Sequence, residues 1–439
     1  MNPDDREWSF SRPGKDRDTF LKAVENWFGT QWLSQLDGSH PLQRLWRRRD
    51  WLSSAELFTI GWALTNQQPM CESDWFIKAA REIKKAPTSG DLFELIAAAM
   101  LNNETHEAHL STYGHPGSDV RVLLPSGTVV NVSCKSLNPS DQELAFRKGA
   151  NELVQTVVSK AESIQASPQI LAVTDTFGIP GTLLREQVTR NICHPLMDTV
   201  FTAGTWTVHV GLLPPSEPNL VVSTYVTPSY HIIVASPLNS GEQRRFENLF
   251  RKATNNLKKH HPSVSRMSIN MIMIKLPESV SFGTAAYWLD GQFTSAYSSI
   301  TAVLLYRTSL RRDNEGVFVS HEVFLRHNPH AKVSWDTISG GLDSLRLVVP
   351  VGKHSTGDPV TSVLLGNTTI AEGPMYLYRR GLIHYEIELP PSKGTTLSFP
   401  WQPHPTVEVR LVFRDPLTGA MDKVGRDPRY LLAPALEML

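Results

Sequence analysis

Three residues between positions 91 and 135 have the types and spacing needed for hydrolytic chemistry. Glu94 is the one charged residue in the apolar run 92–101, and a helix that is apolar on all sides is buried, so its carboxylate needs a partner or a metal ion. Asp119 follows a sharp turn at the start of an expected strand, and Lys135 ends the next strand. An acid that binds a divalent cation, beside a lysine that orients or activates water, suits metal-assisted hydrolysis of phosphodiesters.

Signals along the chain predict which elements position these residues. Turn-forming residues at 86–90 precede the apolar run, and the segment 125–128 turns one strand into the next to close a β-hairpin. The hairpin should bring Asp119 and Lys135 close together. The expected order is a helix at 91–101, strands near 109–113, 119–124 and 129–135, a long helix from 140 to about 166, and a strand at 169–173.

This order resembles the core of the PD-(D/E)XK nuclease superfamily, which includes many restriction endonucleases and runs α-β-β-β-α-β. Gly117-Ser-Asp119 is similar to the first motif, with Ser118 where a proline often stands, and Ser133-Cys-Lys135 is similar to the second. The resemblance covers about residues 88–175. Its motifs are short, but the helix glutamate, the turn with its aspartate, the hairpin and the strand-end lysine occur in the family's order.

The resemblance implies a nuclease that uses Mg²⁺ (or Mn²⁺) to hydrolyse DNA. Asp119 would bind the metal, helped by Glu94 or Glu143 and by the backbone carbonyl of Cys134. Lys135 would position and activate the attacking water. A role as a restriction or anti-phage defence effector is a further expectation by family analogy.

Ser133 departs from the family pattern, because a serine cannot supply the negative charge that holds magnesium. A subgroup of restriction enzymes is similar, with Ser-x-Lys and a carboxylate displaced to the next helix, which here offers Glu143 and Glu152. At 100° per residue Glu143 lies on the apolar face of that helix with Ala150 and Val154, whereas Glu152 points nearly opposite, so Glu143 is favoured.

Each of these residues also has a purely structural interpretation. The spacing Ser140-Asp-Gln-Glu143 forms a capping box, and Glu94 has the same spacing from Asp91, so both glutamates can serve only to begin a helix. Asp119 can be a turn residue and Lys135 a solvated strand end. The alternative function is therefore a catalytically inactive nuclease-fold protein that binds nucleic acid or acts as a scaffold subunit in a larger complex.

Other parts of the sequence suggest two further sites. Cys134 with His109 or His115 could form a thiol nucleophile with its base, but strand alternation turns Cys134 away from Ser133 toward the core, where free cysteines usually lie. The turn residues 236–241, between a strand and a helix, could hold a phosphate at the helix N-terminus, although the same residues are common in loops and caps.

The chain of 439 residues is long enough for about three domains. We expect a Trp-rich helical domain at 1–87, the nuclease-like core at 88–204, a further α/β region at 205–330 and a β-sandwich or barrel-like domain at 331–439. The fold class is thus α/β (α+β). The N-terminal tryptophans are Trp8, Trp27, Trp32, Trp46, Trp51, Trp62 and Trp75.

Lys plus Arg and Asp plus Glu each total 43, so the formal net charge is zero, which argues against a protein that coats nucleic acid. Any positive groove must be local, and two basic stretches could supply it, although a solvated helix face is the default interpretation of each. The candidate nucleic-acid-binding residues are Arg44, Arg47, Arg48, Arg49, Arg244, Arg245, Lys258 and Lys259.

The start of the sequence is charged, the longest apolar stretch is 95–101, and three scattered cysteines cannot form a disulfide framework. We therefore expect a cytoplasmic protein without membrane contact. DNA is the expected partner, with RNA left open, and the flanking domains could dock protein partners or a second copy of the chain. The sequence leaves open the sequence specificity, the oligomeric state and the activating signal.

Overall fold

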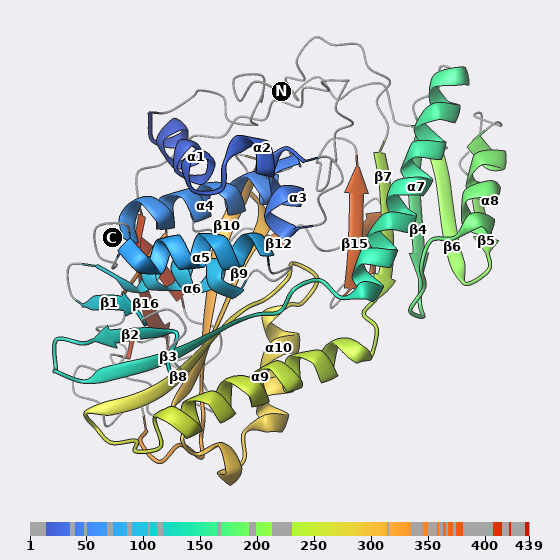
Figure 1. Cartoon of the computed structure of the whole chain (residues 1–439). Helices are drawn as coiled ribbons and strands as arrows, with labels where there is room; N and C mark the ends of the chain where they lie inside the picture. Colours follow the sequence, from blue (N-terminus) through green and yellow to red (C-terminus); the bar gives the residue numbers. More distant parts are fainter. Residues whose placement is uncertain are drawn as a thin grey trace.

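A computed structural model gives the fold of most of the chain (Figure 1). It describes residues 15–35, 40–47, 51–67, 73–85, 90–103, 106–111, 117–164, 168–192, 199–212, 231–313 and 316–334, and the segments 346–349, 358–359, 363–365, 368–371, 375–380, 407–414, 421–422 and 435–438. These residues form a mixed α/β structure with two mixed sheets, as the alternating helix and strand patterns predict.

The larger sheet has the strand order β1-β2-β3-β8-β9-β10 within the described part of the chain, and β12 pairs with β9. Strands β3, β8 and β9 are parallel, and the outer pairs are antiparallel. β3 and β8 are buried along almost their whole length, as expected for parallel strands covered on both faces. The strands are β1 (Glu107–Leu110), β2 (Val120–Leu123), β3 (Val129–Ser136), β8 (Ser268–Lys275), β9 (Ala302–Asp313), β10 (Gly316–His327) and β12 (Asp358–Pro359).

Helices cover both faces of this sheet (Figure 1). On one face lies α6 (Gly90–Leu101), packed on β1, β2 and β3 and covered by α4 (Trp51–Gln67). On the other lie α9 (Gly241–His260) and α10 (Phe282–Gln292), followed by the short 3-10 helix η2 (Ser295–Tyr297). Phe246, Phe250, Ala253 and Leu257 of α9 are buried at helical spacing.

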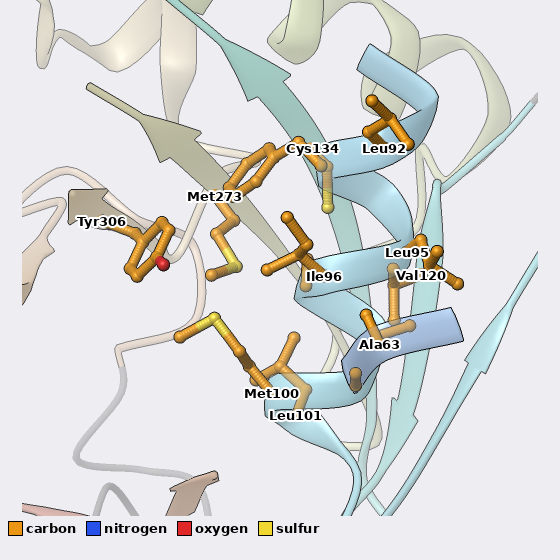
Figure 2. Packing of buried hydrophobic residues seen from close by; sticks show 14 of the residues in the cluster. Ala63, Leu92, Leu95, Ile96, Met100, Leu101, Val120, Cys134, Met273 and Tyr306 are labelled. Carbon is orange, nitrogen blue, oxygen red and sulfur yellow. The ribbon is translucent and has the colours of Figure 1, made fainter. Parts of the chain in front are cut away.

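The N-terminal helices, which we expected to form a domain of their own, share one hydrophobic core with the larger sheet. Val24, Phe28 and Trp62 belong to the same buried cluster as Val132 and Met271 of the sheet. Figure 2 shows the α6 side chains at the centre of this cluster, among them Ile96, beside residues from neighbouring strands. The remaining N-terminal helices are α1 (Lys15–Phe28), α2 (Thr30–Leu33), α3 (Pro41–Arg47) and α5 (Ser73–Lys85).

The second sheet has the order β15-β7-β4-β6-β5, and α7 (Asp141–Ile164) and α8 (Thr182–Ile192) pack on one of its faces (Figure 1). Only β4 and β7 are parallel to each other. Phe146, Ala150 and Val154 of α7 are buried there, which confirms the predicted apolar face of this helix. The strands are β4 (Pro168–Thr174), β5 (Thr199–Ala203), β6 (Trp206–Leu212), β7 (His231–Pro237) and β15 (Met375–Arg380).

One topological expectation is wrong. We expected the long helix and the strand at 169–173 to complete the sheet of the hairpin, but α7 and β4 form correctly and belong to the second sheet. The parallel neighbour of β3 is β8, which follows α9. The antiparallel pair β5 and β6 also lies across position 204, where a domain boundary was expected.

The C-terminal part is rich in strands, as predicted, but two of these strands pair with sheets formed by earlier parts of the chain. β12 joins the larger sheet and β15 joins the second. No helix in the described part of the chain is long and apolar enough to cross a membrane. The other C-terminal strands are β11 (Arg346–Val349), β13 (Val363–Leu365), β14 (Thr368–Ala371), β16 (Val407–Arg414), β17 (Met421–Asp422) and β18 (Ala435–Met438).

Candidate functional site

The hairpin of β2 and β3 brings Asp119 to Lys135, as the sequence predicts. The Asp119 amide donates to the carbonyl of Val132 at 2.8 Å, which extends the strand ladder to the residue before β2. Its carboxylate oxygen Oδ2 accepts three hydrogen bonds: from Ser133 Oγ at 3.0 Å, from the Cys134 amide at 2.6 Å and from Lys135 Nζ at 2.9 Å. The carboxylate is therefore held in one orientation by consecutive residues of β3.

The turn before Asp119 is held by the end of α9. Asn256 Nδ2 donates to the Gly117 carbonyl at 2.6 Å, and the Ser118 amide donates to His261 Nε2 at 3.1 Å. Gly117 has φ 155°, a conformation that residues with a Cβ rarely adopt, so glycine is required there. A helix from more than a hundred residues later thus fixes the position of the aspartate.

Lys135 is a cation at neutral pH. Burial lowers its pKa, but the Asp119 carboxylate and its hydrogen bond outweigh burial, so the pKa of Lys135 is raised overall. The ammonium also donates to the Cys134 carbonyl at 2.7 Å. A lysine that stays protonated can orient an anionic group or stabilise negative charge, but it cannot take a proton from water. Of the two roles expected for Lys135, positioning water fits this protonation state and activating water by deprotonation does not.

Helix α6 adds two more carboxyl groups to the site. Asp91 and Glu94 lie three residues apart and so share a helix face. Burial, together with the smaller effects of the Asp119 and Asp91 charges, raises the pKa of Glu94 to about 8, even though Lys135 lowers it. Burial and Asp119 likewise raise the pKa of Asp91. Lys135 thus bonds Asp119, and Glu94 is mostly protonated at neutral pH.

The carboxyl groups of this site are candidates for binding a divalent cation. The Glu94 side chain makes no hydrogen bond or ion pair with any described residue, and burial is the largest cause of its raised pKa. Among the described residues no three His, Cys, Asp or Glu side chains are grouped to enclose a metal. Magnesium, however, is commonly held by one or two carboxylates with waters and substrate phosphate, which Asp119 and Glu94 could provide.

Ser133 and Cys134 take separate places on β3. Ser133 is fully buried and supports Asp119 through its hydroxyl. Cys134 is 2% exposed and projects toward the side chains of α6, as strand alternation predicts (Figure 2). Burial raises the pKa of the Cys134 thiol well above its usual range, so the thiolate that a cysteine nucleophile needs is disfavoured. The expected partner His115 lies outside the described residues.

The two glutamates of α7 engage partners other than the Asp119 site. Glu143 is buried, as predicted, but its carboxylate accepts from Arg147 Nη2 at 2.6 Å and from Ser279 Oγ at 3.1 Å. Its amide donates to Ser140 Oγ at 2.9 Å, which is the predicted capping contact. Glu152 pairs with Arg185 at 2.6 Å. These contacts favour Glu94 over Glu143 as the second carboxylate.

The expected nucleic-acid-binding residues divide into paired and exposed side chains. Arg245 pairs with Glu242, and Lys258 bonds the Ala296 carbonyl and lies over the Tyr297 ring. Arg44 and Arg47 lie on α3, where Arg47 donates to the Gln35 carbonyl at 2.6 Å. The exposed members are Arg244 and Lys259. Arg48 and Arg49 lie outside the described residues.

A groove of about 530 Å³, which the sequence did not predict, lies beside the turn that precedes Asp119. His109, Arg121 and His261 line it together with Gly117 and Ser118. Strand alternation offered a signal, because Arg121 lies two residues after Asp119 and so points to the same side of the sheet. Nothing local predicted His261, which comes from the end of α9.

No protein-family model, no curated protein and no solved structure matches this chain. We therefore infer its function from the contacts of the site itself.

Proposed function

We propose that this protein is a metal-dependent nuclease that hydrolyses DNA phosphodiester bonds. The observation that carries the proposal is the position of Asp119, whose Oδ2 is fixed by Ser133, Cys134 and Lys135. The charge of this carboxylate also contributes to the raised pKa of Glu94. A fixed acid, a second acid in need of a cation and a protonated lysine form the charge pattern that phosphodiester hydrolysis uses.

The topology of the larger sheet supports a PD-(D/E)XK-like core in an unexpected form. Elements α6, β1, β2, β3, α9 and β8 follow the order α-β-β-β-α-β, with β8 parallel to β3. Residues 137–240, with α7 and most of the second sheet, would then be an insertion between β3 and α9. The sequence resemblance assigned the last helix and strand of the core to α7 and β4, because a helix and a strand directly follow β3 in this arrangement.

Each residue of the site has a role in this proposal. Asp119 and Glu94 would hold Mg²⁺ (or Mn²⁺), which supplies Lewis-acid stabilisation and a stronger water nucleophile. Ser133 Oγ and the Cys134 amide orient Asp119 by occupying Oδ2. The Lys135 ammonium would stabilise negative charge on the phosphate, since it stays protonated. Glu94 would bind the metal ion in its ionised form, because the positive charge of the metal lowers the pKa of a nearby carboxyl group.

Cleavage of plasmid and single-stranded DNA by the full chain, with Mg²⁺ or Mn²⁺, tests the proposal. We expect Asp119→Ala and Lys135→Ala to lower the rate by about a hundredfold or more, as for loss of one charge-stabilising group. Arg185→Ala, which removes the arginine of the partly exposed pair with Glu152, is the matched control and should cleave normally. Unchanged cleavage rates in both Asp119→Ala and Lys135→Ala would show that these residues do not form the active site.

A second candidate function follows from Ser133, which stands where an acid is expected and leaves fewer carboxylates for a cation. It is an inactive nuclease-fold protein that binds nucleic acid or acts as a scaffold. Wild-type protein that binds DNA but shows no cleavage with either metal would favour this function over catalysis.

A restriction or anti-phage role extends the proposal by family analogy. It predicts that cells expressing the wild-type chain restrict phage or incoming plasmid and that Asp119→Ala abolishes the restriction. Equal plating on both strains would leave the nuclease proposal standing without this role.

A further inference from the structure

We propose that the groove beside Asp119, lined by His109, Arg121 and His261, binds a backbone phosphate of the nucleic-acid strand that enters the site. The inference rests on the proposed function, because it assigns a substrate contact to the same site. It concerns residues that the sequence patterns did not mark as nucleic-acid-binding.

The walls of the groove that carry His109 and Arg121 are neighbouring strands. His109 of β1 and Arg121 of β2 lie directly opposite each other in the antiparallel register. Paired residues on adjacent strands hold their side chains about 5 Å apart at Cβ, on the same face. Both side chains are exposed, so either can reach a ligand in the groove.

The third donor comes from the segment after α9. His261 Nε2 accepts the Ser118 amide at 3.1 Å, so the neutral ring carries its proton on Nδ1, which is then a donor. Burial lowers the pKa of His261, and the nearby charge of Arg121 lowers it further, which places the guanidinium and the ring close together. The hydrogen bond to Ser118 also ties this wall to the turn that precedes Asp119.

The charge of the groove selects an anion. Arg121 is a permanent cation, and its planar guanidinium matches phosphate oxygens. Glu107 is the acid of this wall, and it lies exposed at the rim, 3.3 Å from His109 Nε2. The contribution of His109 is therefore partly neutralised, and Arg121 is the residue expected to matter most.

Position relates this anion site to the proposed chemistry. Asp119 and Arg121 are two residues apart on one side of β2, or about 6.6 Å along the strand. A nucleic-acid strand with one phosphate at Asp119 would place another part of its backbone over Arg121. The zero net charge of the chain also requires its positive surface to be local, as it is in this groove.

Binding by a cleavage-deficient full chain tests the groove separately from catalysis. In an Asp119→Asn background with Mg²⁺, fluorescence anisotropy would follow labelled single-stranded and duplex DNA. We expect Arg121→Ala to weaken binding about five- to tenfold and to reduce the slope of log affinity against log salt by about one, as for loss of one phosphate contact. Arg121→Lys should restore the slope, and Arg121→Gln should reproduce the loss.

Arg190→Ala is the matched control, since Arg190 is an exposed arginine on α8 of the second sheet. Equal affinity and salt slope in Arg121→Ala and Arg190→Ala would overturn the groove, as would absence of DNA binding by the Asp119→Asn chain. Cleavage by the wild type is measured separately. Loss of binding in Arg121→Ala without any wild-type cleavage would support the groove and reject the nuclease. Wild-type cleavage with normal binding in Arg121→Ala would support the nuclease and reject the phosphate contact in the groove.

Discussion

Two groups of acids, one buried and one half-buried, have opposite kinds of partners. At the junction between the two sheets, Glu143 is matched by Arg147 and Glu242 by Arg245, at 2.6 and 2.7 Å. Glu242 also accepts the Tyr376 hydroxyl at 2.5 Å. Both glutamates are almost fully buried, and each has its own arginine.

At the hairpin, three acids share a single lysine. Burial, followed by the charge of Asp119, raises the pKa of both Asp91 and Glu94, and Lys135 bonds only Asp119 among the three acids. A carboxyl group whose pKa is raised on folding lowers stability at any pH where it is ionised. The junction acids are therefore paired as acids that stabilise a fold are, whereas the hairpin acids are the ones that we propose bind a ligand of positive charge.

The largest expected effect is at the junction. Arg147→Ala leaves the buried Glu143 carboxylate with a hydrogen bond from the Ser279 hydroxyl but without its cation, and we expect the free energy of unfolding to fall by about 3–5 kcal/mol. Arg185→Ala, which breaks the more exposed pair with Glu152 on the same helix, should cost about 1 kcal/mol or less. Urea unfolding measures both.

Adding Glu143→Gln to Arg147→Ala should recover part of the loss, because the buried charge is then removed. Equal small losses in Arg147→Ala and Arg185→Ala would show that Glu143 is not a stabilising junction acid. That result would also return it to the candidates for the metal site.

The next effect concerns pH at the hairpin. Because the pKa of Glu94 rises from 4.5 to about 8 on folding, the protonated form stabilises the folded state below about pH 4.5 and this contribution is lost as pH rises through about 8. We expect Glu94→Gln to gain about 2–4 kcal/mol over the wild type between about pH 5 and about pH 9, after allowance for relaxation. Urea unfolding at the two pH values measures the gain.

Glu152→Gln is the control, since that carboxyl is partly exposed and paired. Parallel pH dependences of the wild type and Glu94→Gln would mean that Glu94 is not crowded by the other acids. The contrast between the two groups would then disappear.

The smallest effect is produced by the cation itself. Millimolar Mg²⁺ should raise the melting temperature of the wild type by about 1–3 °C, as for a site filled well above its dissociation constant in a chain of this size. Asp119→Asn and Glu94→Gln should lose the shift, and Glu143→Gln should retain it. If the shift in melting temperature is retained in Glu94→Gln and lost in Glu143→Gln, the second metal-binding carboxylate is Glu143 of α7 and not Glu94.

Local patterns predicted much of the candidate site. The hairpin register follows from a short turn between two strands, so the contact between Asp119 and Lys135 could be expected from spacing alone. Strand alternation placed Cys134 in the core, and helix periodicity placed Glu143 on a buried face. Each of these predictions depends on residues that are neighbours in sequence.

The partners of those residues depended on the tertiary structure. Strand β4 and strand β8 both follow a helix and both read as buried strands, so nothing local decides which lies beside β3. Parallel strands need a long connection, and the length of that connection is not encoded in either strand. The sequence therefore predicted α7 and β4 correctly as a helix and a strand, but not the sheet to which they belong.

The sequence by itself determined where acids, lysine and buried faces occur along each element, because side-chain direction follows the period of a helix or strand. The pairing of Glu143 with Arg147 is also local, because the two residues are four apart on one helix. The tertiary structure decided the remaining partners: Ser279 reaches Glu143 from outside α7, and the packing of α6 on the hairpin brings Glu94 near Asp119. Charge balance depends on distances across the fold, and those distances are set when the elements pack together.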